Sequence, residues 1–101
     1  MVRQKLIIIF SKKRLMKFIS HLDLMRLFQR ALRRAELPIA MSEGFSPHPK
    51  ISFKRALALG VESDNEEALF HIDGWIKPEE FSVRLQAQLP EGIMIKTIKV
   101  G

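Results

Sequence analysis

The chain of 101 residues contains no cysteine. Disulfide bonds, iron–sulfur ligation, thiolate zinc sites and a cysteine nucleophile are therefore excluded within it. The absence fits a cytoplasmic setting, where thiols stay reduced, and we expect the protein there. Long apolar runs are also missing, because Leu6–Phe10 has only five residues between basic flanks. Such a run is too short for a signal-peptide core or a spanning helix, so we expect no membrane partner.

Several motifs of known chemistry do not occur either. There is no Gly-rich phosphate loop, no G-x-G-x-x-G and no G-x-S-x-G. Nucleotide-dependent and serine-hydrolase functions therefore lack support. His21, Asp23 and His48 could in principle bind a metal ion, but no H-x-x-x-H pair or second cluster accompanies them. We therefore predict no metal site and no cofactor.

The charge that is present is unevenly distributed. Residues 1–55 carry thirteen Lys and Arg against three acids, whereas residues 56–101 carry four against eight. The net charge of +6 thus comes entirely from the first half of this basic protein. Segregated positive charge indicates a nucleic acid or an anionic surface as partner. Ordinary solubility charge can reach the same net value, so this alternative stays open.

Length and composition predict one globular domain, since 47% of the residues are hydrophobic and 28% are charged. Hydrophobic periodicity predicts alternating strands and helices. The expected elements are a strand over Lys5–Phe10 that residues 15–19 extend or follow, a helix from His21 to Pro38, strands over 51–53, 56–59 and 68–72, a turn over 62–67, a helix from Pro78 to Leu89 and a strand over 93–100. This β-α-β-β-α-β order predicts an α+β fold, the ferredoxin-like split βαβ sandwich, with an antiparallel sheet and two helices on one face.

The first expected helix carries a stripe of arginines. Arg26, Arg30 and Arg33 follow the i, i+4, i+7 spacing of one helix face, and Arg34 lies beside them. The planar guanidinium group matches phosphate geometry better than an ammonium group does. A solvated helix face is the alternative. For Arg33 and Arg34, a favourable charge at the carboxyl end of the helix would explain the arginines equally well.

Two histidines lie where they could bind an anion. Ser20 and Asp23 form a variant of the capping box, so His21 is expected at a helix start, where free N–H groups favour anions. His48 is flanked by prolines that restrict its backbone. We expect this loop to fold over the helix start and to form one cationic pocket with it. Alternatively, His21 is a half-buried cap residue and His48 packs on the core; His71 is expected to be structural. The loop motif consists of Gly44, Phe45, Pro47, His48 and Pro49.

Together these residues predict a surface that binds phosphate or RNA. Its candidate members are Ser20, His21, Arg26, Arg30, Arg33, Lys50, Lys54 and Arg55. Exposed aromatic rings that could stack on bases would be Phe10, Phe45 and Phe53, which could equally belong to the core. His21 and His48 are also candidate catalytic residues, as acid and base of a metal-independent endoribonuclease.

The motifs resemble those of a known family. F-S-K, F-x-S-H-L-D-L-M-R, R-A-L-R-R-A and G-F-x-P-H-P-K occur in this order, and with LGVES at 59–63 they cover residues 10 to 63. This pattern resembles the bacterial radical SAM-linked protein family, whose members are encoded beside, or fused to, a radical S-adenosylmethionine protein and whose activity is uncharacterised. The resemblance implies a radical SAM protein as partner. It marks as motif positions Ser20, His21, Asp23, Arg26, Arg30, Arg33, Arg34, Gly44, Phe45, Pro47, His48, Pro49 and Lys50.

The chain departs from the family pattern in two respects. Ser46 stands where the family usually has asparagine. The chain also stops near the point where family members continue into a second portion. We therefore expect residues 1–101 to be a short version or the N-terminal portion of a longer architecture.

The expected function is that of an accessory module, more a binding protein than an enzyme. It would bind RNA, either tRNA or ribosomal RNA, and present it to the radical SAM partner. The alternatives are the endoribonuclease that uses His48 and His21, and a protein–protein adaptor whose basic face meets an acidic patch.

Overall fold

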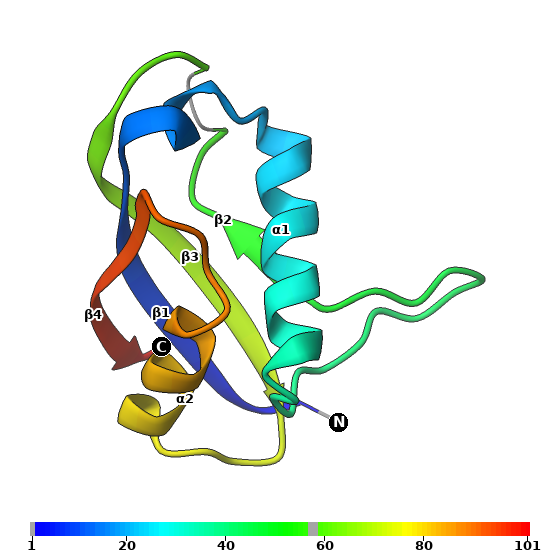
Figure 1. The fold of residues 1–101 in the computed structure, drawn as a ribbon. Helices are drawn as coiled ribbons and strands as arrows, with labels where there is room; N and C mark the ends of the chain where they lie inside the picture. The colour runs from blue at the N-terminus through cyan, green and yellow to red at the C-terminus, as the bar shows by residue number, and fades with distance from the viewer. Residues whose placement is uncertain (1, 57–58) are drawn as a thin grey trace.

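Two helices cover one face of a four-stranded antiparallel sheet in the computed structural model, which describes residues 2–56 and 59–101 (Figure 1). Its elements are β1 (Val2–Lys12), the 3-10 helix η1 (Arg14–Phe18), α1 (His21–Arg34), β2 (Ile51–Phe53), β3 (Ser63–Asp73), α2 (Pro78–Gln86) and β4 (Ile93–Val100). The strand order is β2-β3-β1-β4, and every neighbouring pair is antiparallel. β1 and β2 therefore run in the same direction with β3 between them. This arrangement confirms the predicted ferredoxin-like split βαβ fold.

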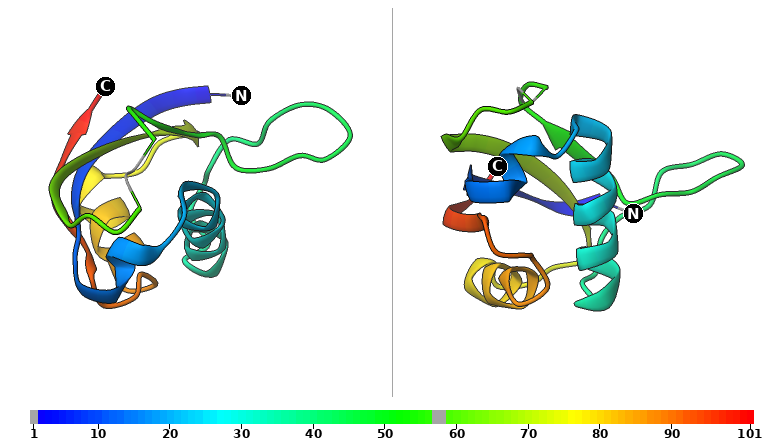
Figure 2. Two further views of the ribbon diagram at one scale, coloured as in Figure 1. Left: turned by 90° about the horizontal axis from the view of Figure 1, so that it is seen from above. Right: turned by 45° about the horizontal axis from the view of Figure 1, so that its top comes forward.

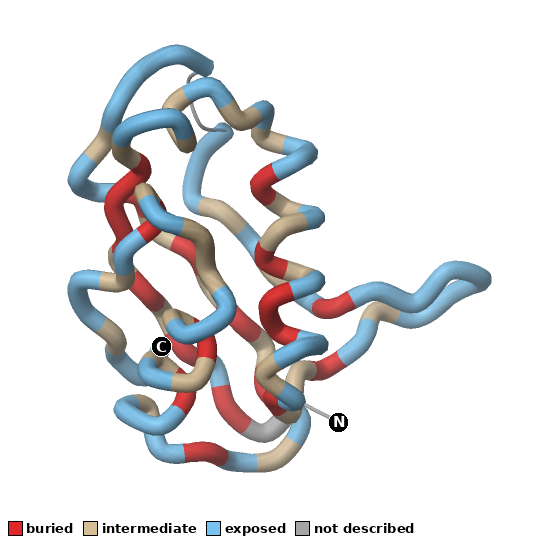
Figure 3. The backbone as a smooth tube through the Cα atoms, in the orientation of Figure 1, coloured by how far each residue is buried: buried red, intermediate tan, exposed pale blue. Residues whose placement is uncertain are grey.

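The core lies between the sheet and the helices because alternate residues of each strand face the same side. Along β1, Leu6, Ile8 and Phe10 are fully buried, and β3 contributes buried residues from Ala68 to Ile72 at the same period. Figure 2 shows both helices on this side of the sheet, and Figure 3 shows the buried positions lining it. The helices add Leu24, Phe28, Ala31, Leu32, Phe81 and Leu85 to the core.

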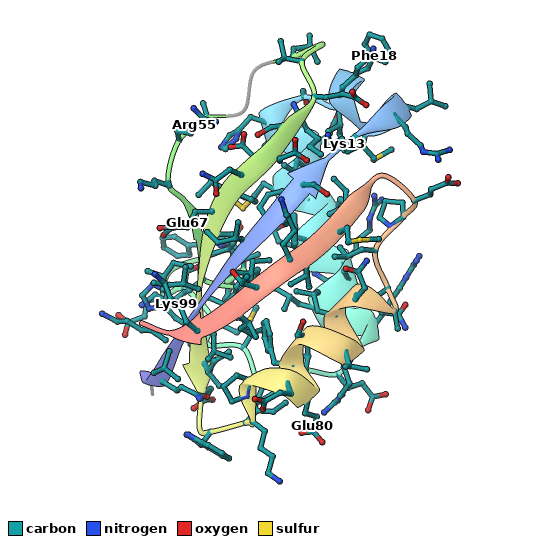
Figure 4. The ribbon with its side chains drawn as sticks, turned by 90° about the vertical axis from the view of Figure 1, so that its left-hand side faces the viewer. Lys13, Phe18, Arg55, Glu67, Glu80 and Lys99 are labelled. Carbon is teal, nitrogen blue, oxygen red and sulfur yellow. The ribbon has the colours of Figure 1, made fainter. Side chains whose placement is uncertain are left out.

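The other face of the sheet carries no helix. Ile7 and Ile9 of β1 and Leu69 of β3 are half-buried on this face, since they alternate with the core residues. Figure 4 looks onto it and shows Glu67 of β3 and Lys99 of β4 among its side chains. No aromatic ring lies at these central positions of the open face. These central positions therefore lack the phenylalanine or tyrosine rings that single-stranded RNA binders often place on a sheet.

Residues 15–19 follow β1 and do not extend it, which is one of the two alternatives expected, because the chain turns at Arg14 (φ 57°) into η1. The boundaries predicted for the third strand and for the last helix were wrong. Residues 63–67 of the expected turn belong to β3, which begins at Ser63. The last helix ends at Gln86, whose side-chain amide bonds the backbone of Ile93 and Ile95 in β4.

The expected strand over 56–59 falls partly on residues 57–58, which lie outside the described residues. Neither Ala56 nor Leu59 is part of a strand. Of the candidate stacking rings, Phe10 is fully buried, and Phe53 packs edge-on against it with 6.2 Å between the ring centroids. Both rings therefore belong to the core.

Candidate functional site

The start of α1 forms as the capping pattern predicts. Ser20 has extended backbone angles, and its Oγ accepts a hydrogen bond from the N–H of Asp23 at 3.1 Å. His21 then packs its ring edge-on against Phe53, with 5.3 Å between the centroids. Its Nδ1 is buried and has no hydrogen-bond partner among the described residues. His21 is thus a half-buried residue that fastens the helix start to β2, as one of the two alternatives expected.

The arginine stripe of α1 lies on the exposed side of the helix. Arg26 is 3.7 Å from the carboxylate of Asp23, and both side chains are more than half exposed. Arg30, Arg33 and Arg34 are exposed, and none of them forms an ion pair with an acid in the described part of the chain. These three guanidinium groups therefore keep their hydrogen-bond donors available to a ligand.

The carboxyl end of α1 is capped by a different arginine. Arg84 of α2 donates through Nη2 to the carbonyl oxygens of Ala35 and Glu36. These carbonyls would otherwise lack an intrahelical partner. Because Arg84 satisfies them, the two arginines in the last turn of α1 are not needed as a cap.

Two hollows divide the stripe. A hollow of about 510 Å³ lies between α1 and the segment 87–90 after α2, and Arg30 and Arg34 line it. Another, of about 300 Å³, joins Arg33 to Met41 and Pro49. Arg33 therefore faces the base of the motif loop, whereas Arg30 and Arg34 face the end of α2.

The motif loop is a projecting ribbon, which we call the arm (residues 41–49). The two sides of the arm pair with each other: Ser42 N–H donates to the carbonyl of His48 at 2.8 Å, and His48 N–H donates to Ser42 Oγ at 3.1 Å. At the base, Ala40 N–H donates to the carbonyl of His71 in β3, and Lys50 N–H donates to the carbonyl of Ala40. Figures 1 and 2 show the arm extending away from the body in every view, and Phe45 in it is fully exposed.

The arm does not fold over the start of α1, so the expected cationic pocket is not formed. The side-chain hydrogen bonds at His48 join residues of the arm: its N–H donates to Ser42 Oγ, and its Nδ1 lies 3.2 Å from the carbonyl oxygen of Pro49. His21 instead packs on Phe53, at the far end of β2 from the arm. The two histidines therefore do not share one phosphate as acid and base. His21, Asp23 and His48 likewise form no metal site, and no group of three possible ligands gathers within residues 2–56 and 59–101.

The basic residues around β2 have unlike roles. Lys50 and Lys54 are exposed. Arg55 is occupied: its Nε and Nη2 donate to the two carboxylate oxygens of Glu66, which is only 4% exposed. Arg55 thus has an acid partner within the fold while its side chain stays largely exposed, and its place in the RNA-binding set remains a prediction.

Two buried charged residues, Lys12 of β1 and Glu66 of β3, were not predicted from the sequence. Lys12 is 1% exposed and has the same alternation as Phe10 on the core side of the strand. A lysine and a glutamate at buried strand positions read as solvated charges in the sequence. For Lys12, the signal that could have indicated burial is its position two residues after Phe10, because alternate residues of a strand face the same side.

His71, expected to be structural, lies on the open face and holds the arm through its backbone. Burial lowers the pKa of its imidazole from the ordinary 6.5, and the charges of Lys50 and Lys5 lower it further. The unfolded chain therefore binds the proton more tightly. The contribution of neutral His71 to the free energy of unfolding is therefore complete above pH 6.5. It is lost as the pH falls from there through the folded-state pKa.

We expect the melting temperature of the wild type to fall more between about pH 7.5 and about pH 5 than that of His71→Gln. Thermal unfolding followed by circular dichroism at both pH values measures the difference. All other titrating groups are common to the two proteins, so their contributions cancel. An equal fall in both proteins would contradict the assignment.

Fold and site together define a small α+β domain with an arginine-bearing helix and a projecting arm. Residues 5–100 match the family described as an uncharacterized protein conserved in bacteria (DUF2344), and the chain belongs to this family. Membership of an uncharacterised bacterial family is thereby confirmed, whereas the link to a radical SAM protein stays a prediction. None of the curated proteins compared with the chain matches it. Among the described residues, no helix is long and apolar enough to cross a membrane.

Proposed function

We propose that the protein is an accessory module that binds RNA through the exposed arginines of α1. The observation that carries this proposal is the distribution of ion pairs. Lys13 pairs with Asp64 at 2.9 Å and Arg14 pairs with Glu91 at 3.0 Å. The arginine face, defined as Arg30, Arg33 and Arg34, has no such partners in the described part of the chain.

Unpartnered arginines side by side repel one another, and an anion between them relieves this repulsion. A phosphate group accepts paired hydrogen bonds from the guanidinium fork, so a phosphate chain is a fitting ligand. Lys50 and Lys54 extend the positive surface at β2. Cations spread over a helix and a strand fit a chain of successive phosphates better than a single anion.

The motif resemblance adds the setting of this function. We propose that the RNA is a tRNA or ribosomal RNA and that the module works in the cytoplasm with a radical SAM partner enzyme. The partner is supported by the motifs at residues 10–63 alone. Co-purification of the two proteins with and without nuclease treatment tests whether they meet directly or through RNA.

The endoribonuclease alternative loses its support because His21 and His48 do not share a site. An adaptor function is favoured by one observation. A hollow of about 610 Å³, lined by residues 14–18, Pro90 and Glu91, is bordered by exposed Leu15 and Phe18. Apolar side chains exposed around a hollow mark protein contacts. A protein partner that remains bound after nuclease treatment would support this second candidate.

The proposed function predicts how RNA affinity responds to salt. Each phosphate contact contributes about 0.7 to the slope of log affinity against log salt for a single strand. The double variant Arg30→Gln and Arg34→Gln is therefore expected to reduce that slope by about 1.4. Fluorescence anisotropy of a labelled RNA over a series of salt concentrations measures it.

The matched control is the double variant Lys13→Gln and Arg14→Gln, which removes the same net charge from paired positions. Its slope should stay at the wild-type value. Equal losses in both variants would mean that diffuse charge, and not the arginine face, attracts the RNA. Absence of wild-type binding at low salt would end the proposal.

A further inference from the structure

We propose that Phe45 at the tip of the arm stacks on an unpaired nucleobase of the bound RNA. This inference rests on the proposed function and names its ligand class. The RNA would present a single strand or an open loop at the arm, because bases in a duplex are stacked on one another and offer no free face.

The arm holds the ring in a defined place. Its two sides are joined by the hydrogen bonds between Ser42 and His48, and its base is tied to β3 through His71. Pro47 restricts the backbone beyond the tip. Gly44 has φ +117°, which allows the sharp reversal just before Phe45. Because these bonds and the turn at Gly44 already order the arm, little conformational entropy is lost when Phe45 binds a ligand.

Phe45 is the one fully exposed ring among the phenylalanines of the described residues. The residue has a relative exposure of 108%, whereas Phe10, Phe28, Phe70 and Phe81 are fully buried. Phe18 is 59% exposed, and the ammonium of Lys17 lies 5.1 Å from its ring centroid. Only the arm therefore offers both faces of a phenylalanine ring to a ligand.

The cations lie where a strand passing the tip would need them. Arg33 shares a hollow with Met41 and Pro49, the two residues that close the base of the arm. Lys50 follows directly and is exposed. The four residue steps from Met41 to Phe45 span at most about 13 Å. When phosphates are bound where the arm joins the body, a nucleobase of the same RNA strand can therefore reach the ring of Phe45.

The surroundings of Phe45 favour a base over a protein pocket. Residues that dominate the binding energy of a protein interface lie in well-packed pockets, within a ring of contacts that excludes water. The neighbours of Phe45 are Glu43, Gly44 and Ser46, all exposed and none of them apolar and large. Stacking on a base needs only the flat face of the ring and tolerates polar neighbours.

The test compares Phe45→Ala, Phe45→Trp and Phe18→Ala in the full chain. The probes are a labelled adenine-rich single strand of about 12 nucleotides and a duplex of the same length. Phe45→Ala is expected to weaken single-strand binding roughly 5- to 100-fold without changing the salt slope, because no phosphate contact is lost. Phe45→Trp should restore wild-type affinity. Duplex binding by Phe45→Ala and single-strand binding by Phe18→Ala should remain at the wild-type level.

Each other outcome overturns the inference. If Phe45→Ala binds the single strand as tightly as the wild type while the Arg30 and Arg34 variant is weakened, the stacking arm is wrong and the proposed function stands. An equal loss on single strand and duplex would exclude base stacking. Loss of a protein partner with RNA affinity unchanged would assign the ring to a protein pocket. A wild type that binds neither probe at low salt would remove both proposals.

Discussion

Phe28→Ala is expected to lower the free energy of unfolding by about 3–5 kcal/mol. Phe28 is fully buried on α1, and its ring centroid lies 5.3 Å from that of Phe10, 5.7 Å from that of Phe53 and 6.0 Å from that of Phe70. The residue therefore joins α1 to three strands at once. Its removal leaves a cavity that this small core fills only in part.

Chemical denaturation with urea measures this loss through the midpoint at constant m-value. Phe18→Ala is the control, because the same side chain is removed from a position that is 59% exposed. Its effect should stay within about 0.5 kcal/mol. A loss below about 1 kcal/mol for Phe28→Ala would show that α1 is not held on the sheet by this ring.

Gly92→Ala is expected to lower the free energy of unfolding by roughly 2–5 kcal/mol. Gly92 has φ +101°, which strains any other residue, and an added Cβ would lie 2.5 Å from the carbonyl oxygen of Lys13. That contact is with backbone, which cannot move aside cheaply. Lys13 N–H also donates to the carbonyl of Gly92 at 2.8 Å, so the clash would disturb the join between η1 and β4.

Gly74→Ala separates the two causes. Gly74 has φ +105°, and no atom lies within 4 Å of its added Cβ. This variant should show only the backbone strain, roughly 1–3 kcal/mol. The difference between the two midpoints then reports the steric clash alone. Equal losses in the two variants would contradict the close approach of Lys13 to Gly92.

The arginines of this protein differ in their contacts. Arg84 caps the carboxyl end of α1, and Arg55 holds the buried carboxylate of Glu66. Arg30 and Arg34, in contrast, line a hollow without an acid partner in the part of the chain that is described. Net charge alone would count all four as equal. Their hydrogen bonds and ion pairs distinguish Arg55 and Arg84, which contact other parts of the fold, from Arg30 and Arg34, which have no acid partner among the described residues.

Local features of this protein followed from the sequence alone. Ser20 caps α1 as predicted, because the bond to Asp23 N–H joins residues three apart. The common face of Arg26, Arg30 and Arg33 follows from helical periodicity in the same way. The order of strands and helices was predictable as well, since apolar period and turn residues are read within short windows.

Tertiary structure decided what depends on residues distant in the chain. Nothing near Arg55 in sequence reveals that Glu66 is buried against it, because that burial comes from the pairing of β1 with β3. The direction of the arm likewise depends on hydrogen bonds that Ala40 and Lys50 form with His71. These bonds, and the packing of His21 on Phe53, separate the two histidines that the motif had suggested as one pocket. Local sequence determines periodicity and caps, whereas only the closed fold determines which charges meet.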